Sequence, residues 1–255
     1  MTAVCPNAKV TVRKLTLIIA LVVLVLGGGL AWRGSRAPAR ASAPAVHVAL
    51  GASDAVGIGA TRPATEGWVP LVTAGLPEAT QLLNLGVSGA TLADVLRDQL
   101  PVAVDAEARW VTLWPGPNDF RNGVPLATFT QQLDQLLAAL QATPATSSRS
   151  SSGVNRSRTI AVVTMPDLRA LPSFARSEPT ALDARVREWN AAIAAVVGRH
   201  APAAILVDLY GGAAEFAARP DYVSADGFHP STAGYRRIAE LVLDVLRRDD
   251  PAAIR

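Results

Sequence analysis

The sequence predicts an α/β fold of three layers, with helices on both faces of a five-stranded, mostly parallel sheet. Two observations predict it. Amphipathic helical patterns alternate with strand-length segments, which favours a parallel sheet between helical layers. Those segments, most of them rich in Val, Ile, Leu or Trp with little polar alternation, are typical of strands buried on both faces. The five segments are Val46–Leu50, Gln81–Leu85, Trp110–Trp114, Thr159–Thr164 and Ile205–Leu209.

Four stripes of apolar residues at helical spacing accompany these strands. They run from Leu92 to Leu100, from Phe129 to Leu140, from Leu182 to Val197 and from Ile238 to Leu246. Residues 142–158 interrupt the pattern because they are serine-rich and have no apolar period. We expect this stretch to be a disordered surface loop within the domain, with a basic interaction patch as the alternative.

The first 32 residues predict a signal peptide or a transmembrane anchor. Leu15–Trp32 is uncharged and mostly apolar with bases on either side, at the lower edge of the length that spans a bilayer. Ala41-Ser42-Ala43 resembles a signal-peptidase site, so both a cleaved and a membrane-retained segment stay open. Residues 33–45 then predict a flexible tether and residues 46–250 the globular domain, which we expect outside the cytoplasm, secreted or membrane-anchored.

Charge and cysteine content exclude several functions. The formal net charge is +3, but residues 1–43 hold six bases and no acid, which leaves 18 bases against 21 acids in the remainder. The domain is therefore slightly acidic and lacks the excess of basic residues that is typical of nucleic-acid-binding proteins. The single cysteine, Cys5, precedes the apolar segment. An intramolecular disulfide and a catalytic cysteine in the domain are both excluded.

Polar residues follow each predicted strand. Sites of open parallel sheets form at the carboxyl ends of the strands, so these residues are expected to converge on one edge of the sheet. In chain order they are Ser53 and Asp54; Asn84, Gly86 and Ser88; Gly116, Asn118 and Asp119; Asp167; and Asp226 with His229.

Only His229 among the three histidines is placed as a catalytic base would be. Asp226 precedes it by three residues, close enough for a carboxylate to reach the imidazole, and Ser231 or Thr232 is expected to cap the next helix. The other interpretation is a helix-entry loop in which both side chains only cap. His47 lies inside a predicted strand, so we expect it to be packed in the sheet. His200 lies between a helix and a strand, where we expect it to face solvent or cap the helix.

Two competing assignments remain open. Ser88 lies in Gly-Val-Ser-Gly-Ala, one residue short of the G-x-S-x-G nucleophile elbow, but Thr91-x-x-Asp94 just after it is typical of a helix capping pair. Asp208 competes with Asp226 as the partner of His229. The histidine spacing gives no metal site, and the glycines complete no nucleotide-binding motif, so we expect no cofactor and no metal.

The ordered motifs resemble those of the SGNH (GDSL-type) hydrolases, a family of esterases, lipases, thioesterases and carbohydrate acyl-esterases. The matching segments are Gly-Ala-Ser after the first strand, Gly86 in NLGVSGAT, Asn118 in GPND, and Asp226 with His229 in DGFHP. The resemblance implies the flavodoxin-like fold of that family. It makes Ser53 the nucleophile, His229 its general base and Asp226 the residue that orients the imidazole. It also implies an oxyanion hole from the backbone N–H groups of Ser53 and Gly86 and the Asn118 amide.

The opening motif departs from the family, which usually has Gly-Asp-Ser where this chain has Gly-Ala-Ser-Asp. Ala52 removes a carboxylate and Asp54 places one a residue after the serine. We hypothesise that Asp54 braces this loop and is not catalytic.

The resulting hypothesis is a serine esterase that hydrolyses carboxylic or thio-esters through an acyl-serine intermediate. Its expected partner is a small-molecule, lipid or carbohydrate ester, and the membrane if the N-terminal segment is retained. The alternatives are a membrane-tethered binding domain without turnover and an acyltransferase that uses the same residues. Apolar residues of the neighbouring loops suit a modest apolar acyl group; they are Ile58, Trp68, Phe120, Leu168, Leu171 and Phe174.

Overall fold

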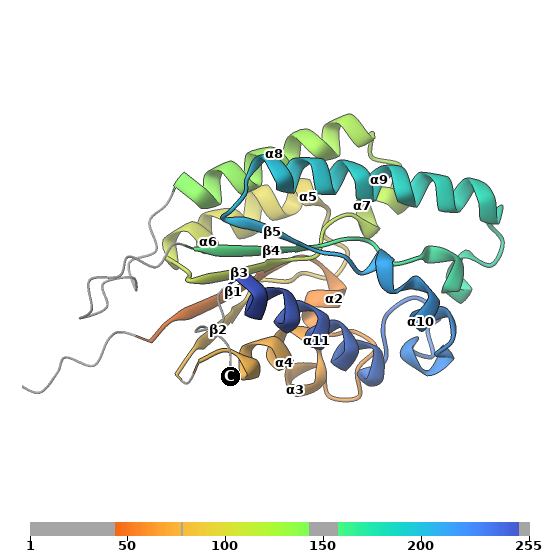
Figure 1. Ribbon diagram of the computed structural model, residues 1–255, viewed down its shortest axis with the longest axis horizontal. Helices are drawn as coiled ribbons and strands as arrows, with labels where there is room; N and C mark the ends of the chain where they lie inside the picture. The colour runs from red at the N-terminus through yellow and green to blue at the C-terminus, as the bar shows by residue number, and fades with distance from the viewer. Residues whose placement is uncertain (1–43, 78, 143–157, 250–255) are drawn as a thin grey trace, which may run out of the picture. The chain divides into compact units, whose positions relative to one another are not determined.

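Five parallel strands form the centre of the computed structural model, which describes residues 44–77, 79–142 and 158–249 (Figure 1). The sheet order is β2-β1-β3-β4-β5, and every neighbouring pair is parallel. Each strand coincides with a predicted segment to within two residues at either end. The strands are β1 (Val46–Leu50), β2 (Gln81–Asn84), β3 (Trp110–Leu113), β4 (Thr159–Val163) and β5 (Ala204–Val207).

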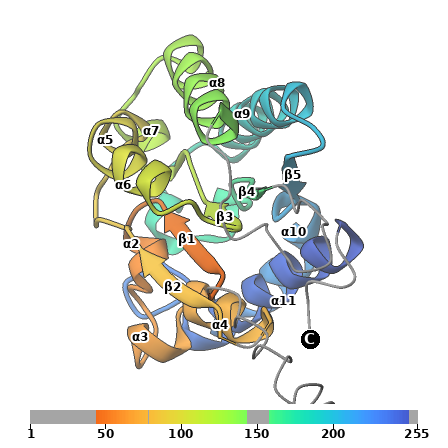
Figure 2. The same ribbon diagram turned by 90° about the vertical axis from the view of Figure 1, so that its left-hand side faces the viewer.

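Helices cover both faces of the sheet, as Figure 2 shows, so the predicted three-layer fold is confirmed. Within residues 44–77, 79–142 and 158–249 the helices are α2 (Ser53–Val56), α3 (Pro63–Glu66), α4 (Trp68–Gly75), α5 (Leu92–Asp94), α6 (Leu100–Asp105), α7 (Pro117–Arg121), α8 (Leu126–Ala142), α9 (Pro179–Arg199), α10 (Ala213–Ala217) and α11 (Thr232–Asp249). A π-helical turn, Val95–Gln99, joins α5 to α6. The sequence pattern missed α4, which packs against α11.

Alternate residues of the central strands supply two separate cores, because successive strand side chains point to opposite faces. In β4, Ile160 and Val162 pack under α8 and α9, while Ala161 and Val163 pack with α4 and α11. The edge strand β2 differs from the prediction of strands buried on both faces. Three of its four residues are exposed, because only β1 pairs with it and little covers its faces.

The strand order places the change of direction between β1 and β3. The chain moves from β1 to β2 on one side and then crosses to β3 on the other. In sheets of this order the crevice at the carboxyl ends of these two strands is the usual ligand site. The loops that carry Ser53 and Asn118 both begin there.

Several sequence-based expectations fall outside the described residues. The predicted signal or anchor segment 1–32 lies there, as do most of the tether 33–45 and positions 143–157 of the expected disordered loop. The two ends of that loop belong to the fold, which corrects its limits. Ala142 ends α8, and Arg158 is buried with its guanidinium bonded to the backbone carbonyls of Ala108 and Leu140. No helix in the described part of the chain is both long and apolar enough to cross a bilayer.

Candidate active site

Ser53 lies at the end of β1, on a turn that the backbone makes through Gly51. Gly51 has φ of 140°, in the region that favours glycine. Ser53 begins the short helix α2, where a helix leaves its first N–H groups without an intrahelical acceptor. Its side chain is nearly buried, with 8% of the residue exposed. The turn therefore presents the hydroxyl from a fixed backbone rather than from a mobile loop.

Gln99 holds this turn from below. Its amide nitrogen donates to the Gly51 carbonyl at 2.9 Å, and its amide oxygen accepts from the Gly51 N–H at 3.0 Å. Gln99 is 3% exposed. The Gly51 carbonyl also accepts from Val87 N–H at 3.2 Å, so the Gly51 N–H is the group that would be buried without a partner if Gln99 were absent. The sequence analysis missed this residue because its inward direction depends on the π-helical turn that ends at Gln99, which apolar periodicity does not reveal.

The structure brings Ser53, His229 and Asp226 together. His229 Nε2 lies 2.8 Å from Ser53 Oγ, and His229 Nδ1 lies 2.6 Å from Asp226 Oδ2. Both ring nitrogens therefore have partners, and the bond to the carboxylate favours the tautomer with a proton on Nδ1. Nε2 is then free to accept a proton from the serine hydroxyl. Ser53 and His229 are separated by 176 positions in the chain.

Asp226 is held as a carboxylate. Partial burial opposes its ionisation, but hydrogen bonds outweigh this and keep the Asp226 pKa well below its usual range. The donors are the His229 ring, the backbone N–H groups of Phe228 and His229, and the Ser224 hydroxyl, at 2.6 to 2.9 Å. A fixed negative charge at this position stabilises a positively charged imidazole.

The loop that carries His229 is anchored at both ends. Ser224 N–H donates to the His229 carbonyl at 2.8 Å, and Ser231 N–H donates to the Tyr222 carbonyl at 2.8 Å. The Ser231 hydroxyl accepts from Gly234 N–H at 3.2 Å and so caps α11, as predicted. Gly59 approaches this loop so closely that a Cβ there would lie 2.4 Å from the Pro230 carbonyl oxygen. The histidine is therefore fixed by backbone contacts on two sides.

Of the donors expected for an oxyanion hole, the Asn118 amide has a free hydrogen, whereas the Gly86 N–H already donates to another group. The Asn118 amide nitrogen donates one bond, to the Ala90 carbonyl at 2.9 Å, and its second hydrogen remains available. Gly86 N–H donates to the side-chain oxygen of Asn84 at 3.1 Å. Gly86 also lies close to the serine turn, because a Cβ there would be 2.7 Å from Ala55 Cβ. The Gly86 N–H therefore already has a competing acceptor in Asn84, the last residue of β2.

The Asp54 carboxyl accepts a hydrogen bond from its own backbone N–H in the serine turn, and its role as a brace of this loop stays a hypothesis. Its Oδ2 is buried and has no hydrogen-bond partner among the described residues. Burial raises the Asp54 pKa to about 7. Asp54 also belongs to the lining of an apolar pocket beside His229.

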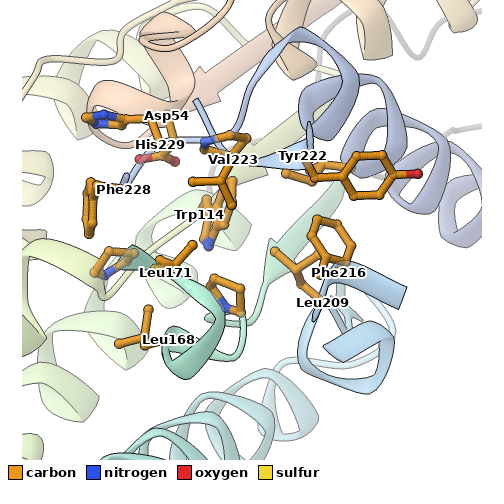
Figure 3. A pocket seen from close by; sticks show the side chains of 14 residues that line it. Asp54, Trp114, Leu168, Leu171, Leu209, Phe216, Tyr222, Val223, Phe228 and His229 are labelled. Carbon is orange, nitrogen blue, oxygen red and sulfur yellow. The ribbon is translucent and has the colours of Figure 1, made fainter. Parts of the chain in front are cut away.

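This pocket, drawn in Figure 3, lies next to the histidine and has a volume of about 50 Å³. Trp114, at the end of β3, forms one wall, and Phe228 lies beside His229 on another. Two residues that the sequence named for an acyl pocket, Leu168 and Leu171, line it. Trp68 and Phe120 instead belong to the two cores.

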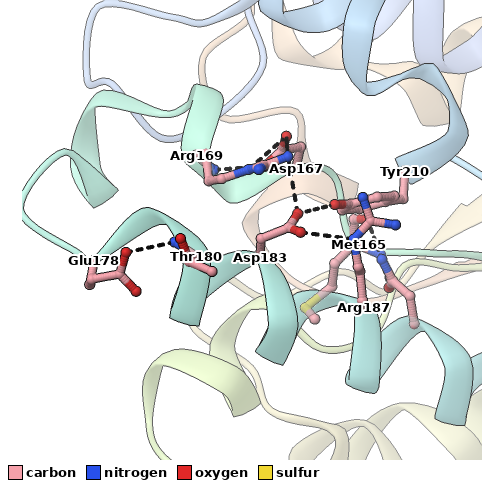
Figure 4. A network of polar contacts seen from close by, with 9 residues as sticks. Met165, Asp167, Arg169, Glu178, Thr180, Asp183, Arg187 and Tyr210 are labelled. Carbon is pink, nitrogen blue, oxygen red and sulfur yellow. Dashed lines mark hydrogen bonds and ion pairs between the residues drawn. The ribbon is translucent and has the colours of Figure 1, made fainter.

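The loop that carries Leu168 and Leu171 is held by a polar network (Figure 4). Arg169 pairs with Asp167 at 2.7 Å and with Asp183 of α9 at 3.0 Å. Asn190 donates to the Met165 carbonyl and accepts from the Met165 N–H, both at 2.9 Å. Asp167, one of the polar residues expected at the sheet edge, thus serves the pocket wall rather than the serine.

The remaining candidates lie elsewhere. Ser88 is exposed, and Thr91 with Asp94 forms the predicted capping box. Asp208 accepts from Gly211 N–H at 2.9 Å and has no contact with His229. His47 is packed in β1 between two threonine hydroxyls, and burial lowers its pKa to about 3.

His200 ends α9 and pairs with Asp134 at 3.0 Å. In the part of the chain that the structure describes, no group of three or more His, Cys, Asp or Glu side chains is arranged to hold a metal ion.

A hydrogen-bonded sequence of serine, histidine and aspartate is the arrangement that serine hydrolases use. Residues 49–237 match the model of the GDSL-like Lipase/Acylhydrolase family. The chain therefore belongs to the GDSL-like lipase/acylhydrolase family and is a hydrolase of that type. No curated protein matches the sequence.

Solved structures show the same fold at low identity. A lipase/acylhydrolase from Enterococcus faecalis is 21% identical, with a TM-score of 0.60, and the match covers 81% of this chain and 96% of that one. A lipolytic protein of the G-D-S-L family from Veillonella parvula is 22% identical, with a TM-score of 0.60 and coverage of 80% and 98%. The esterase EstA from Pseudoalteromonas is 17% identical, with a TM-score of 0.56 and coverage of 80% and 97%.

Proposed function

We propose that the chain is a serine esterase that cleaves carboxylic or thio-esters with Ser53, His229 and Asp226. The observation that carries the proposal is the unbroken chain of contacts from Asp226 through His229 to Ser53, at 2.6 and 2.8 Å. A serine hydroxyl is a weak nucleophile until a positioned base removes its proton. Ser88, the competing serine, is exposed, and among the described residues the hydrogen bond from a serine hydroxyl to a histidine is that of Ser53.

In the first half of the reaction His229 Nε2 takes the Ser53 proton while Oγ bonds to the ester carbonyl carbon. The carbonyl oxygen becomes an oxyanion, which in this proposal accepts hydrogen bonds from the Ser53 N–H and from the second amide hydrogen of Asn118. His229 then gives the proton to the leaving alcohol or thiol, and the acyl-serine remains. Water repeats the sequence in the second half, releasing the acid and restoring the Ser53 hydroxyl.

In this proposal the Gly86 N–H can join the oxyanion hole only if it breaks its hydrogen bond to Asn84 Oδ1 and donates to the oxyanion instead. Its hydrogen bond to Asn84 Oδ1 at 3.1 Å is longer than the usual charge-assisted bond to an oxyanion. A developing negative charge is a stronger acceptor than a neutral amide oxygen. The N–H is therefore expected to turn from Asn84 to the oxyanion as the charge forms, and to return afterwards.

The test is hydrolysis of p-nitrophenyl acetate and butyrate by the purified protein. Ser53→Ala is expected to lower kcat/KM by at least a thousandfold, since the nucleophile is lost. Ser88→Ala is the matched control and is expected to keep the parent rate. Loss of activity in Ser88→Ala alone would transfer the role to Ser88. A protein that neither turns over these esters nor reacts with a fluorophosphonate would be a binding domain instead.

The site residues serve acyl transfer equally well, since a second alcohol can replace water in the second half of the reaction. Adding glycerol or a simple sugar to the assay separates the two reactions. A hydrolase releases one acid for each p-nitrophenol, whereas an acyltransferase releases less acid and forms the new ester.

The reaction is proposed to take place outside the cytoplasm. The support is the apolar segment Leu15–Trp32, with bases on both sides, ahead of the domain. A fusion of residues 1–45 to a reporter enzyme that is active only after export tests this directly. An inactive reporter would place the hydrolase in the cytoplasm.

A further inference from the structure

Arg121, at the end of α7, carries a positive charge that no described residue balances. Its side chain is exposed, and its guanidinium forms no ion pair or hydrogen bond with the residues that the structure describes. Arg169 shows the contrast, since it pairs with both Asp167 and Asp183. The Arg121 guanidinium lies instead over the ring of Phe228, with its central carbon 4.8 Å from the ring centroid.

The ring of Phe228 connects this charge to the catalytic histidine. Phe228 directly precedes His229, and the two rings meet at 85° with their centroids 4.9 Å apart. Because one ring makes both contacts, the Arg121 guanidinium lies within about 10 Å of the imidazole, which is about one Debye length at 0.1 M salt. Phe228 also lines the apolar pocket beside His229 (Figure 3). The free cation is therefore next to the reaction site and only partly screened from it.

Helix α7 holds the other end of the Arg121 side chain. Asn118, the proposed oxyanion donor, precedes Arg121 by three residues on this helix, and side chains three residues apart lie on the same side of a helix. The start of α7 is fixed, because the Asn118 amide donates to the Ala90 carbonyl at 2.9 Å and the Asp119 carboxyl accepts from Leu92 N–H at 3.1 Å. Arg121 thus reaches from the helix of the oxyanion donor to the loop of the base.

The chemistry of this cation indicates which group it binds best. A guanidinium has five N–H donors and no acceptor, and it stays protonated throughout the working range of an enzyme. The ring of Phe228 attracts the positive charge but leaves the strong N–H donors of Arg121 without a carboxylate. The planar arrangement of these donors matches a carboxylate or a phosphate, which accepts two parallel hydrogen bonds.

We propose that Arg121 binds a negatively charged group of the ester substrate, a carboxylate or a phosphate a few bonds from the scissile ester. The proposal rests on the proposed esterase function and names its substrate class. In that function the ester carbonyl lies at Ser53, with its oxygen toward Asn118 and its leaving group near His229. Such a substrate lies between α7 and the histidine loop, which are the two elements that Arg121 contacts. Arg121 is a specificity residue, because it takes no part in the bond changes.

The test compares esters of the same size with and without the charge. For the acyl side the pair is mono-p-nitrophenyl adipate and the p-nitrophenyl ester of adipic acid monoamide. For the alcohol side it is 4-acetoxybenzoate and 4-acetoxybenzamide. The two esters of a pair differ in intrinsic reactivity, so the readout is their kcat/KM ratio in the parent divided by the same ratio in Arg121→Gln. This quotient is expected to favour the anion at least about threefold in one pair, and below that in both pairs it would overturn the proposal.

Two further variants separate recognition of a charge from a general effect of net charge. Arg121→Lys keeps the charge without the planar donors and is expected to retain part of the preference for the anionic ester. Arg248→Gln is the matched control, because it removes an equal exposed charge about 24 Å along α11 from the histidine loop. The preference is expected to stay at the parent value there. Equal losses of preference in Arg121→Gln and Arg248→Gln would contradict the assignment.

The dependence on salt gives an independent readout that a purely structural role would not change. The preference of the parent for the anionic ester is expected to fall as the ionic strength is raised from about 0.01 to 1 M, because the Debye length shortens from about 30 to 3 Å. The preference that remains in Arg121→Gln is expected to depend less on salt. The same salt dependence in the two proteins would overturn the role given to Arg121.

A binding measurement separates this proposal from the esterase function itself. The four esters are titrated by NMR into Ser53→Ala, which lacks the nucleophile, and into the double variant that also carries Arg121→Gln. One anionic ester is expected to bind at least about threefold more tightly to the first protein, whereas its neutral partner binds both equally. Equal affinities, or no binding to either protein, would overturn the subsite even if Ser53 proved to be the nucleophile. The expected difference would support the subsite even if the parent hydrolysed none of these esters.

Discussion

At the scale of single residues, the contact between Asp226 and His229 determines how well the imidazole can act as a base. Asp226 Oδ2 lies 2.6 Å from Nδ1, and its other oxygen accepts three further bonds. These bonds keep the carboxylate both ionised and oriented. The imidazole is consequently fixed with Nε2 toward Ser53.

Asp226→Asn is expected to reduce kcat on the order of a thousandfold or more, with little change in KM. The amide cannot hold the proton-bearing Nδ1 in the same way, so the tautomer with a free Nε2 is no longer favoured. Steady-state kinetics with p-nitrophenyl butyrate measure the effect. Asp208→Asn is the control, since Asp208 bonds to Gly211 and not to His229. Equal losses in the two variants would contradict the role given to Asp226.

Gly86→Ala is expected to lower activity because no space exists for the added methyl group. A Cβ at this position would lie 2.7 Å from Ala55 Cβ and 3.0 Å from the Ala52 carbonyl, so the serine turn must move. Gly198→Ala in α9 is the matched control, because a Cβ there meets nothing within 4 Å. The measurements are the melting temperature and kcat, and Gly86→Ala is expected to lower both. Parent-like activity in Gly86→Ala would contradict the close packing at this position.

The residues that the sequence assigned to the site are those with chemical signatures. Ser53, His229 and Asp226 stand out because each follows a strand or precedes a helix and carries a reactive group. Gln99 and Trp114 do not stand out, since their roles depend on the directions in which a π turn and a strand end point them. The burial of the Asp54 carboxyl was not predicted, because sequence adjacency does not tell in which direction a carboxylate points.

At the scale of elements, the π-helical turn between α5 and α6 connects helix packing to the serine turn. The wider turn places Gln99 against the Gly51 backbone, where the amide bonds to both the N–H and the carbonyl. The spacing of apolar residues identified the stripe from Leu92 to Leu100 but predicted one regular helix, without the π-helical turn at Val95–Gln99. Inserted π turns change the direction of one residue without changing the apolar stripe, and for that reason the sequence did not reveal it.

Gln99→Leu is expected to destabilise the fold by about 1–3 kcal/mol and to reduce kcat. It leaves the Gly51 N–H buried without a partner, which costs about that much, whereas the Gly51 carbonyl keeps its bond from Val87 N–H at 3.2 Å. Urea unfolding gives the free energy change, with Gln131→Leu on the exposed side of α8 as control. An unfolding free energy equal to that of the parent would mean that Gln99 does not hold the turn.

At the scale of the whole molecule, the α/β alternation was enough to predict the layers, and the strand limits came within two residues. Continuous apolar runs carry that information, because buried parallel strands require it. The exposure of β2 was not predictable from its composition, since the edge position depends on the strand order. Helix α4 was missed for a related reason: it is short, and its buried residues read equally well as part of a loop.

The stability of the molecule is expected to depend on pH through Asp54. Its pKa is raised from 3.8 to about 7 by burial, so the folded chain keeps a proton that the unfolded chain releases between those values. Stability is therefore lost as pH rises through this window, by on the order of 4 kcal/mol in total. Burial lowers the pKa of His47 from 6.5 to about 3. This histidine therefore has the opposite effect, because protonation of the unfolded chain lowers the stability of the fold as pH falls through that window.

Asp54→Asn removes the first contribution alone. The unfolding free energy of the variant minus that of the parent is expected to increase from pH 4 to pH 7 and then to level off. Taking this difference at each pH cancels the effects of His47 and of Asp119, whose pKa burial also raises, to about 6. A difference that is flat with pH would contradict an Asp54 carboxyl that is buried and unpaired.

The most direct test of the account is the position of a covalent phosphonate adduct. The protein is incubated with a fluorophosphonate, digested, and the modified peptide is sequenced by mass spectrometry. The account predicts one adduct on Ser53, lost in Ser53→Ala, slowed in Asp226→Asn and unchanged in Ser88→Ala. An adduct on Ser88, or ester hydrolysis that continues while Ser53 stays unmodified, would contradict it.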